Sequence, residues 1–196
     1  MDSRADSPQV SHSKRRSNAE PVEASGARAM LRHFLASLAY RTQKALRGAP
    51  SGFGEFRIAS DVRNPRELVK HMTSVLGYSR TFFVGGEYWP DSLPTLDEEV
   101  ARFHTVLQSL SEHFNTGDFS NMAPERFLQG PLSDAMSHVG QLAMLRRLFQ
   151  APVPPESFIM ADIRAGNVSS HQPDSVSPDE FWHTPAGPQP VPDNRR

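Results

Sequence analysis

The sequence contains no cysteine, which excludes disulfide bonds, thiolate metal sites and cysteine nucleophiles. It also has no apolar run approaching the roughly 18 residues of a transmembrane helix, so we expect no contact with a membrane. A net charge of −1 provides no global field that would attract nucleic acid, and nucleic acid is not expected as a partner. The basic residues near the N-terminus are not followed by the apolar stretch of a secretory signal, so the expected location is cytoplasmic.

Proline is abundant, with 17 residues, whereas only 37% of the chain is hydrophobic. Residues 1–25 are polar and charged, and residues 170–196 hold six of the prolines. Neither segment has enough apolar surface to offset the entropy lost on ordering, so both are predicted to be disordered tails. The segment between them, residues 26–169, is predicted to fold as one domain.

Apolar residues with helical spacing predict four helices of about 20 residues each. They cover about residues 27–47, 65–84, 96–117 and 124–150. Asn64 followed by Pro65 suits the start of the second helix, and Thr95 with Glu98 forms a capping box before the third. Gly130 and Pro131 are expected to interrupt the fourth. We predict an all-α four-helix bundle in which a long connection between the first two helices crosses one end.

Ionisable residues interrupt two of the predicted apolar faces. In the second helix, His71 lies in the stripe formed by Leu68, Val75, Tyr78 and Phe82. In the fourth, Asp134 and His138 lie one turn apart in the stripe formed by Ala135, Leu142, Leu145 and Phe149. Since the apolar faces of a bundle meet, these three side chains are expected to converge.

Burying an unpaired carboxylate is costly, so this group requires compensation. One solution is a divalent metal ion held by His71, Asp134 and His138, with coordination positions left open as in catalytic sites. The other is a hydrogen-bonded aspartate–histidine pair with a buried water. The sequence lacks the motifs of nucleotide-binding loops, serine hydrolases and H-E-x-x-H metalloproteases.

The segments LVKHMTSVLGYS, TLDEEVARFHTVLQSL and LSDAMSHVGQLAMLRRLF resemble the DinB-like superfamily over residues 27–150. The resemblance implies a four-helix bundle with a long crossover. It also implies a metal site made of one histidine of the second helix and an H-x-x-x-H pair of the fourth, followed by Gly-Gln. His71 and His138 match two of the ligands, Gly140-Gln141 follows, and Asp134 replaces the remaining histidine.

Aspartate either keeps the site and shifts its preference from zinc or nickel toward iron or manganese, or marks the loss of the metal. The resemblance further implies a metal-dependent transferase or hydrolase that uses a low-molecular-weight thiol. Glu67, His104, Tyr78 and Gln141 are candidates to surround the ion or face a substrate. The alternative is a non-catalytic bundle, able to form a homodimer, whose vestigial pocket binds a ligand or partner.

Overall fold

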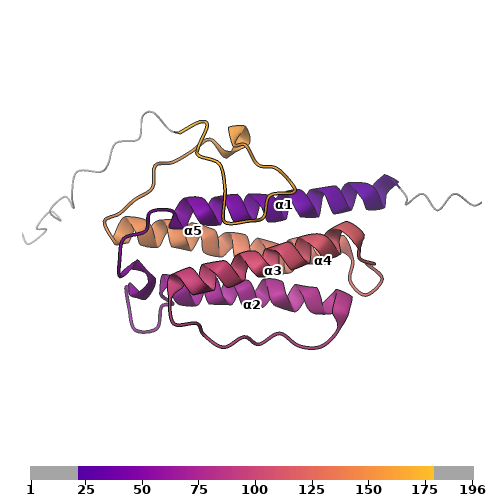
Figure 1. Cartoon of the computed structure of the whole chain (residues 1–196), viewed down its shortest axis with the longest axis horizontal. Helices are drawn as coiled ribbons and strands as arrows, with labels where there is room; N and C mark the ends of the chain where they lie inside the picture. Colours follow the sequence, from indigo (N-terminus) through magenta and orange to yellow (C-terminus); the bar gives the residue numbers. More distant parts are fainter. Residues whose placement is uncertain (1–21, 179–196) are drawn as a thin grey trace, which may run out of the picture.

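The computed structural model describes residues 22–178, which are built from four long helices and four short helical segments (Figure 1). The long helices are α1 (Val22–Leu46), α2 (Pro65–Val84), α3 (Leu96–Thr116) and α5 (Ser133–Leu148). The short segments are η1 (Phe53–Glu55), α4 (Pro124–Phe127), the π-helical η2 (Leu128–Leu132) and η3 (Phe158–Met160). Within these residues there is no strand, only one isolated bridge between Glu156 and Pro178, so the predicted all-α class is confirmed.

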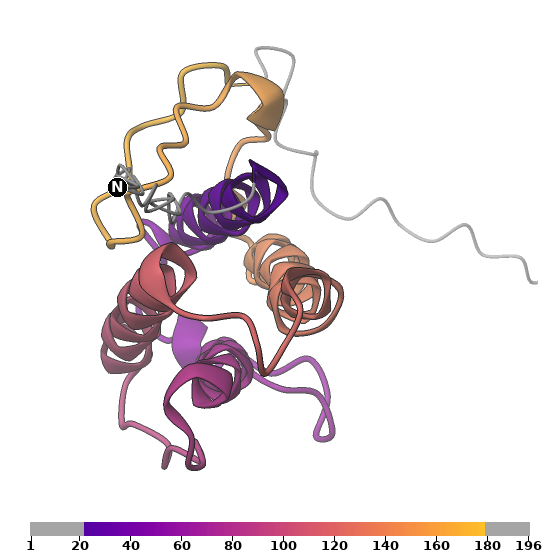
Figure 2. The same cartoon turned by 90° about the vertical axis from the view of Figure 1, so that its right-hand side faces the viewer.

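The four long helices surround one core (Figure 2). Helices α1 and α2 each pack on both α3 and α5, and they lie diagonally opposite one another. The connection through η1 therefore passes across one end of the molecule, as the sequence predicted. The largest side chains that are fully buried in the core are Phe53, Phe103, Phe114, Phe127, Leu35, Leu38, Met72, Leu76, Leu107, Leu110, Leu132 and Leu142.

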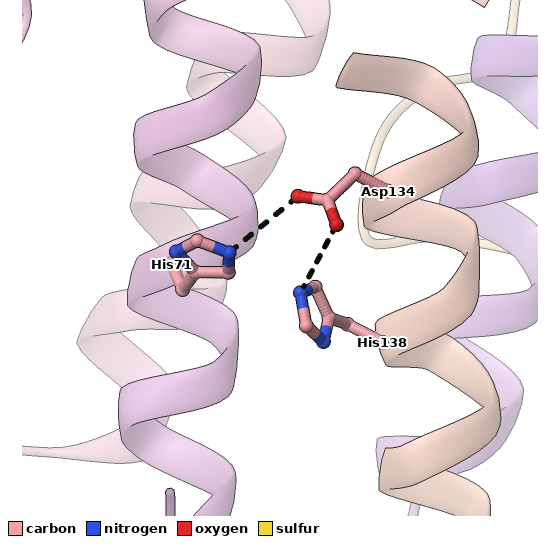
Figure 3. A group of neighbouring side chains, drawn as sticks. All are labelled: His71, Asp134 and His138. Carbon is pink, nitrogen blue, oxygen red and sulfur yellow. Dashed lines mark ion pairs between the residues drawn. The ribbon is translucent and has the colours of Figure 1, made fainter. Parts of the chain in front are cut away.

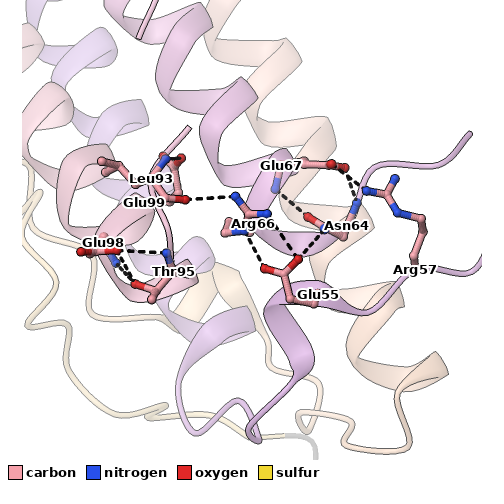
Figure 4. Close-up of polar contacts among 9 residues, drawn as sticks. All are labelled: Glu55, Arg57, Asn64, Arg66, Glu67, Leu93, Thr95, Glu98 and Glu99. Atoms are coloured by element: carbon pink, nitrogen blue, oxygen red, sulfur yellow. Dashed lines mark hydrogen bonds and ion pairs between the residues drawn. The ribbon is translucent and has the colours of Figure 1, made fainter. Parts of the chain in front are cut away.

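The starts of α2 and α3 are fixed by the two predicted caps (Figure 4). The Asn64 side chain accepts a hydrogen bond from the Glu67 backbone at 2.9 Å, and the Glu67 carboxylate accepts one from the Asn64 backbone at 3.0 Å. Thr95 and Glu98 form the same reciprocal pair before α3. Each cap satisfies backbone donors that the first turn of a helix leaves unpaired.

Asn64→Ala should lower the free energy of unfolding by about 0.5–2 kcal/mol, because it removes this cap at a buried position. Urea denaturation of wild type and variant measures the difference. Asn115→Ala is the matched control, since Asn115 is exposed in the last turn of α3 and caps no helix start. Equal losses in the two variants would contradict a specific capping role for Asn64.

The buried face of α2 differs from the predicted one. Val69, Met72 and Leu76 are buried, whereas Tyr78 of the predicted stripe is 54% exposed. The two faces are offset by about one residue, or roughly 100° around the helix. Because α2 packs on α3 as well as on α5, its core face lies between these neighbours. The stripe that contains His71 is therefore a flank that faces α5.

The described chain also extends beyond the predicted domain boundaries. Helix α1 begins at Val22, so residues 22–25 of the predicted N-terminal tail are helical. Residues 170–178 of the predicted C-terminal tail lie along α1, where Arg47 donates hydrogen bonds to the Asp174 carboxylate and the Gln172 carbonyl. Composition underestimated the extent of the structured region at both ends. A helix can continue beyond its apolar stripe, and a polar segment can be held by one arginine. The remainder of both predicted tails, 1–21 and 179–196, lies outside the described residues.

Candidate metal centre

A π-helical turn sets the rotation of α5 just before Asp134. The turn covers Leu128–Leu132 and contains Pro131, which has no backbone N–H to donate. The Ser133 hydroxyl donates to the Leu128 carbonyl at 2.6 Å and so satisfies an acceptor within the turn. Phe127 and Leu132, five positions apart, are both buried. The predicted interruption at Gly130 and Pro131 is thus a widened turn rather than a break, a feature that often adjoins functional sites.

The structure brings together the three predicted ligands, His71 from α2 and Asp134 and His138 from α5 (Figure 3). The Asp134 carboxylate oxygens lie 3.5 Å from His71 Nε2 and 3.6 Å from His138 Nε2. One ligand atom from each residue lies within 4.8 Å of the other two. Ligands at roughly 2.1 Å from a tetrahedral ion are about 3.4 Å apart, so the aspartate–histidine separations suit a shared ion.

His138 is the most buried of the three, with 10% of its side chain exposed. Its Nδ1 lies 2.9 Å from the Gln141 amide oxygen, one turn along α5. Because an amide oxygen only accepts, this hydrogen bond requires the proton on Nδ1 and leaves the lone pair on Nε2. Nε2 is buried and has no hydrogen-bond partner among the described residues. The hydrogen bond to Gln141 therefore leaves a buried, unsatisfied lone pair on His138 Nε2, which faces Asp134. An outer partner of a metal-bound histidine orients its ligand in the same way.

His71 is held in a form suited to binding a cation. Its side chain is 30% exposed, and its ring meets the His138 ring edge to face with centroids 4.8 Å apart. Burial, together with the positive charge of Arg63 and the neighbouring His138, lowers the pKa of His71 even though Asp134 opposes the shift. The imidazole therefore stays neutral, and able to ligate a metal, at a lower pH than an ordinary histidine does.

Asp134 lies at the open edge of the group, with 46% of its side chain exposed, rather than inside the core as its predicted stripe implied. A cleft of about 570 Å³ borders Asp134 and is also lined by Val75 and Tyr78. A second cleft of about 570 Å³ borders His138 and Gln141. One ligand of the group, His138, is thus buried, and two solvent-accessible clefts border the group. This arrangement leaves room for a substrate or water beside an ion.

The remaining candidates divide into those near the group and those engaged elsewhere. Tyr78 lines the cleft beside Asp134, and Gln141 contacts His138 directly. Glu67 is used by the α2 cap and by an ion pair with Arg57. His104 is buried on α3, where its two ring nitrogens contact Gln43 and the Val168 carbonyl, and burial lowers its pKa. His104 is therefore a structural residue outside the metal group.

Sequence reasoning did not single out the loop that covers the second cleft. Ile58, Val62 and Arg63 precede α2 and line this cleft opposite His138. These residues have no helical or alternating pattern, so only their position just before the Asn64 cap could have suggested that they lie near His71. The Arg63 charge also acts on His71, which places this loop at the site.

No protein-family description matches the chain, and no curated protein or solved structure is similar to it. The resemblance to the DinB-like superfamily therefore stays a prediction. Of the helices in residues 22–178, none has both the length and the apolar character required to cross a membrane.

Gln141→Ala should weaken binding of a divalent ion by roughly 10- to 100-fold, the usual cost of removing a partner that orients a metal ligand. The His138 ring would lose the contact that fixes its tautomer. Isothermal titration of purified protein with Zn²⁺ measures the change. Gln108→Ala on the exposed surface of α3 is the control and should bind like wild type. Unchanged affinity in Gln141→Ala would show that the glutamine does not orient His138.

Proposed function

We propose that the protein binds one divalent metal ion through His71, Asp134 and His138. The observation that carries this proposal is the buried Nε2 of His138, which faces a carboxylate and a second imidazole but has no hydrogen-bond partner within residues 22–178. An unsatisfied polar atom in this position is costly unless a ligand completes it. Both aspartate–histidine separations exceed the 2.7–3.2 Å usual for a hydrogen bond, so the direct pair explains the geometry less well than an ion between the three groups.

The arrangement of the helices and the positions of the three ligands support a DinB-like four-helix bundle as the family of this fold. The support lies in His71 on α2 and in Asp134 and His138 one turn apart on α5, with Gln141 against His138. The long connection between the diagonal helices α1 and α2 agrees with the crossover of that family. The proposal depends on this combination and not on helix number alone.

For this site we propose a metal-dependent transferase or hydrolase that uses a low-molecular-weight thiol or water as nucleophile. A divalent ion with open coordination positions lowers the pKa of a bound thiol or water and so supplies a nucleophile at neutral pH. The hydrogen bond between His138 and Gln141 fixes the direction from which one imidazole would bind the ion. The exposed side of Asp134 would let a substrate reach the ion from the cleft lined by Val75 and Tyr78. Besides Asp134, that cleft is lined by apolar side chains, the Tyr78 phenol, and the polar side chains of Gln129, Ser133 and Ser137.

Titration of metal-free protein with Zn²⁺, Ni²⁺, Fe²⁺ and Mn²⁺ tests the metal site. We expect one ion per chain and a rise in melting temperature, because binding to the folded state alone stabilises it by about 2.7 kcal/mol at 100 times the dissociation constant. Absence of saturable binding by all four ions would refute the proposal and favour the non-catalytic reading. Thiol transfer is then assayed with the loaded protein, glutathione and an activated aryl halide.

The same titration of Asp134→His examines the role of the carboxylate. Imidazole is a neutral and softer ligand, so the variant should favour Zn²⁺ and Ni²⁺ over Mn²⁺ more strongly than wild type does. If Asp134 only accepts hydrogen bonds from the two histidines, the larger ring should overpack the site and cost roughly 1–3 kcal/mol of stability without changing metal preference. A well-folded variant with unchanged metal preference would rule out Asp134 as a ligand.

A further inference from the structure

A cavity separate from the two clefts described above lies on the flank of α5 opposite the metal group. Its volume is about 260 Å³, and α5 contributes Met136, Gly140, Ala143 and Arg147 to its wall. At 100° per residue these positions share one side of the helix, whereas Asp134, His138 and Gln141 lie roughly 160° away. The core face of α5 separates the two sides, so this cavity is independent of the proposed metal site.

The chain that follows α5 forms one wall of the cavity. This segment folds back over α1 (Figure 1). Residues 153–156 and Phe158 line the cavity together with residues of α1 and α5. Glu156 fastens the segment to α1: its carboxylate, fully buried, accepts a hydrogen bond from Tyr40 at 2.6 Å and pairs with Lys44 at 3.1 Å. The hydrogen bonds from these groups lower the pKa of Glu156 against the opposing effect of burial. The wall is therefore held in place without any ligand.

Arg41 brings to this cavity a positive charge that forms no ion pair within residues 22–178. Its guanidinium lies 3.9 Å from the centre of the Phe158 ring, and its one hydrogen bond is a weak contact with the Met136 sulfur at 3.9 Å. The Glu156 carboxylate is paired with Lys44 and acts on Arg41 only through its charge. Burial lowers the pKa of Arg41, and the charge of the Glu156 carboxylate opposes this shift.

The lining of the cavity indicates what would satisfy this charge. Most of the wall is apolar, from Ala45 of α1, Val139 and Ala143 of α5, and Val153. A guanidinium binds a planar carboxylate through two parallel hydrogen bonds, and the nearby Glu156 carboxylate disfavours a dianion. The volume lies below the roughly 300–1,000 Å³ of pockets for drug-sized ligands, so the ligand is small.

We propose that this cavity is a binding site for a small monocarboxylate with an apolar body. The carboxylate binds Arg41, and the hydrocarbon packs against Ala45, Val139 and Ala143. The Phe158 ring lies against the guanidinium, and both residues line the cavity. This site goes beyond the proposed metal function and requires no metal ion.

Octanoate is the probe, used with the full chain and below its micelle-forming concentration. We expect saturable binding of one octanoate per chain, with shifts of the backbone amide signals of Gly140 and Ala143 in NMR spectra. Octanol, which keeps the chain but lacks the charge, should bind at least tenfold more weakly, and so should acetate, which lacks the chain. Equal binding of octanol, equal binding of inorganic phosphate, or no saturable octanoate binding would overturn the proposal.

Arg41→Gln should weaken octanoate binding by roughly 10- to 100-fold, as expected for the loss of hydrogen bonds to a charged group. Arg63→Gln is the matched control: it removes the same charge from an exposed residue near the metal group and should bind octanoate like wild type. Octanoate affinity that is the same in Arg41→Gln and wild type would overturn the assignment.

A second variant keeps the test decisive if Arg41→Gln folds poorly. Gly140→Leu fills the cavity from α5, where a Cβ atom at this position meets nothing within 4 Å. It should abolish octanoate binding while the variant stays folded, and unchanged binding would overturn the proposal. His138→Gln should bind octanoate normally, so loss of the metal site and loss of the carboxylate site are measured separately.

Discussion

His138→Gln should weaken binding of a divalent ion by about 1,000-fold or more, since removing a ligand costs more than the roughly 10- to 100-fold lost with an outer partner. The Nε2 atom of His138 is buried and has no hydrogen-bond partner in the described part of the chain, so no solvent molecule replaces it easily as a ligand. Glutamine retains polarity and approximate length but lacks the ring nitrogen at this position. Titration with Zn²⁺ at neutral pH measures the loss of affinity. Binding is monitored through the heat released and through the shift in melting temperature.

The control for this prediction is His33→Gln, a change of the same kind at an exposed histidine of α1. It should leave both metal affinity and melting temperature unchanged. The metal-free His138→Gln protein should be about as stable as metal-free wild type, because the glutamine amide can donate a hydrogen bond to the Asp134 carboxylate, whereas the unprotonated Nε2 of His138 cannot. A large loss of stability in the metal-free variant with no change in metal affinity would show that His138 is a structural residue and that the ion does not bind there.

The sequence predicted that His71, Asp134 and His138 converge, because each of these residues breaks a pattern. An imidazole in an apolar stripe of α2 and two ionisable groups one turn apart on α5 are visible without coordinates, and helix geometry brings the two flanks together. What the pattern could not predict is the rotation of each helix. The apolar positions of α2 allow more than one stripe, and the choice depends on the packing of both α3 and α5. Tyr78 and Asp134 were therefore expected to be more buried than they are.

The cavity beside Arg41 shows a different limit of sequence reasoning. Glu156 is more than 100 positions from Tyr40 and lies in a segment rich in proline, where no periodicity marks a buried carboxylate. Composition predicted disorder from residue 170, although Gln172 and Asp174 hydrogen-bond to Arg47. Such contacts depend on single polar side chains meeting across the fold, which neither propensity nor composition encodes.

Phe127→Ala should lower the free energy of unfolding by about 3–5 kcal/mol, the usual cost of removing a buried phenylalanine ring. Phe127 is 1% exposed, and its ring packs on Phe83, Phe114 and Phe119 with centroids 5.2–5.9 Å apart. That loss is a large part of the roughly 5–15 kcal/mol that stabilises a typical domain. Urea denaturation measures it, with Phe127→Leu as the milder variant if the alanine protein does not fold.

Phe127→Ala should also weaken metal binding by the folded protein. Phe127 anchors the chain immediately before the π-helical turn, and that turn sets the rotation of α5 and the direction of Asp134. Phe119→Ala is the matched control: Phe119 packs in the same aromatic cluster but precedes α4, so its loss should reduce stability less and leave metal affinity unchanged. Equal metal affinities in the two folded variants would show that the π-helical turn holds its shape without the Phe127 anchor. A selective loss in Phe127→Ala would instead connect the aromatic core directly to the geometry of the metal ligands.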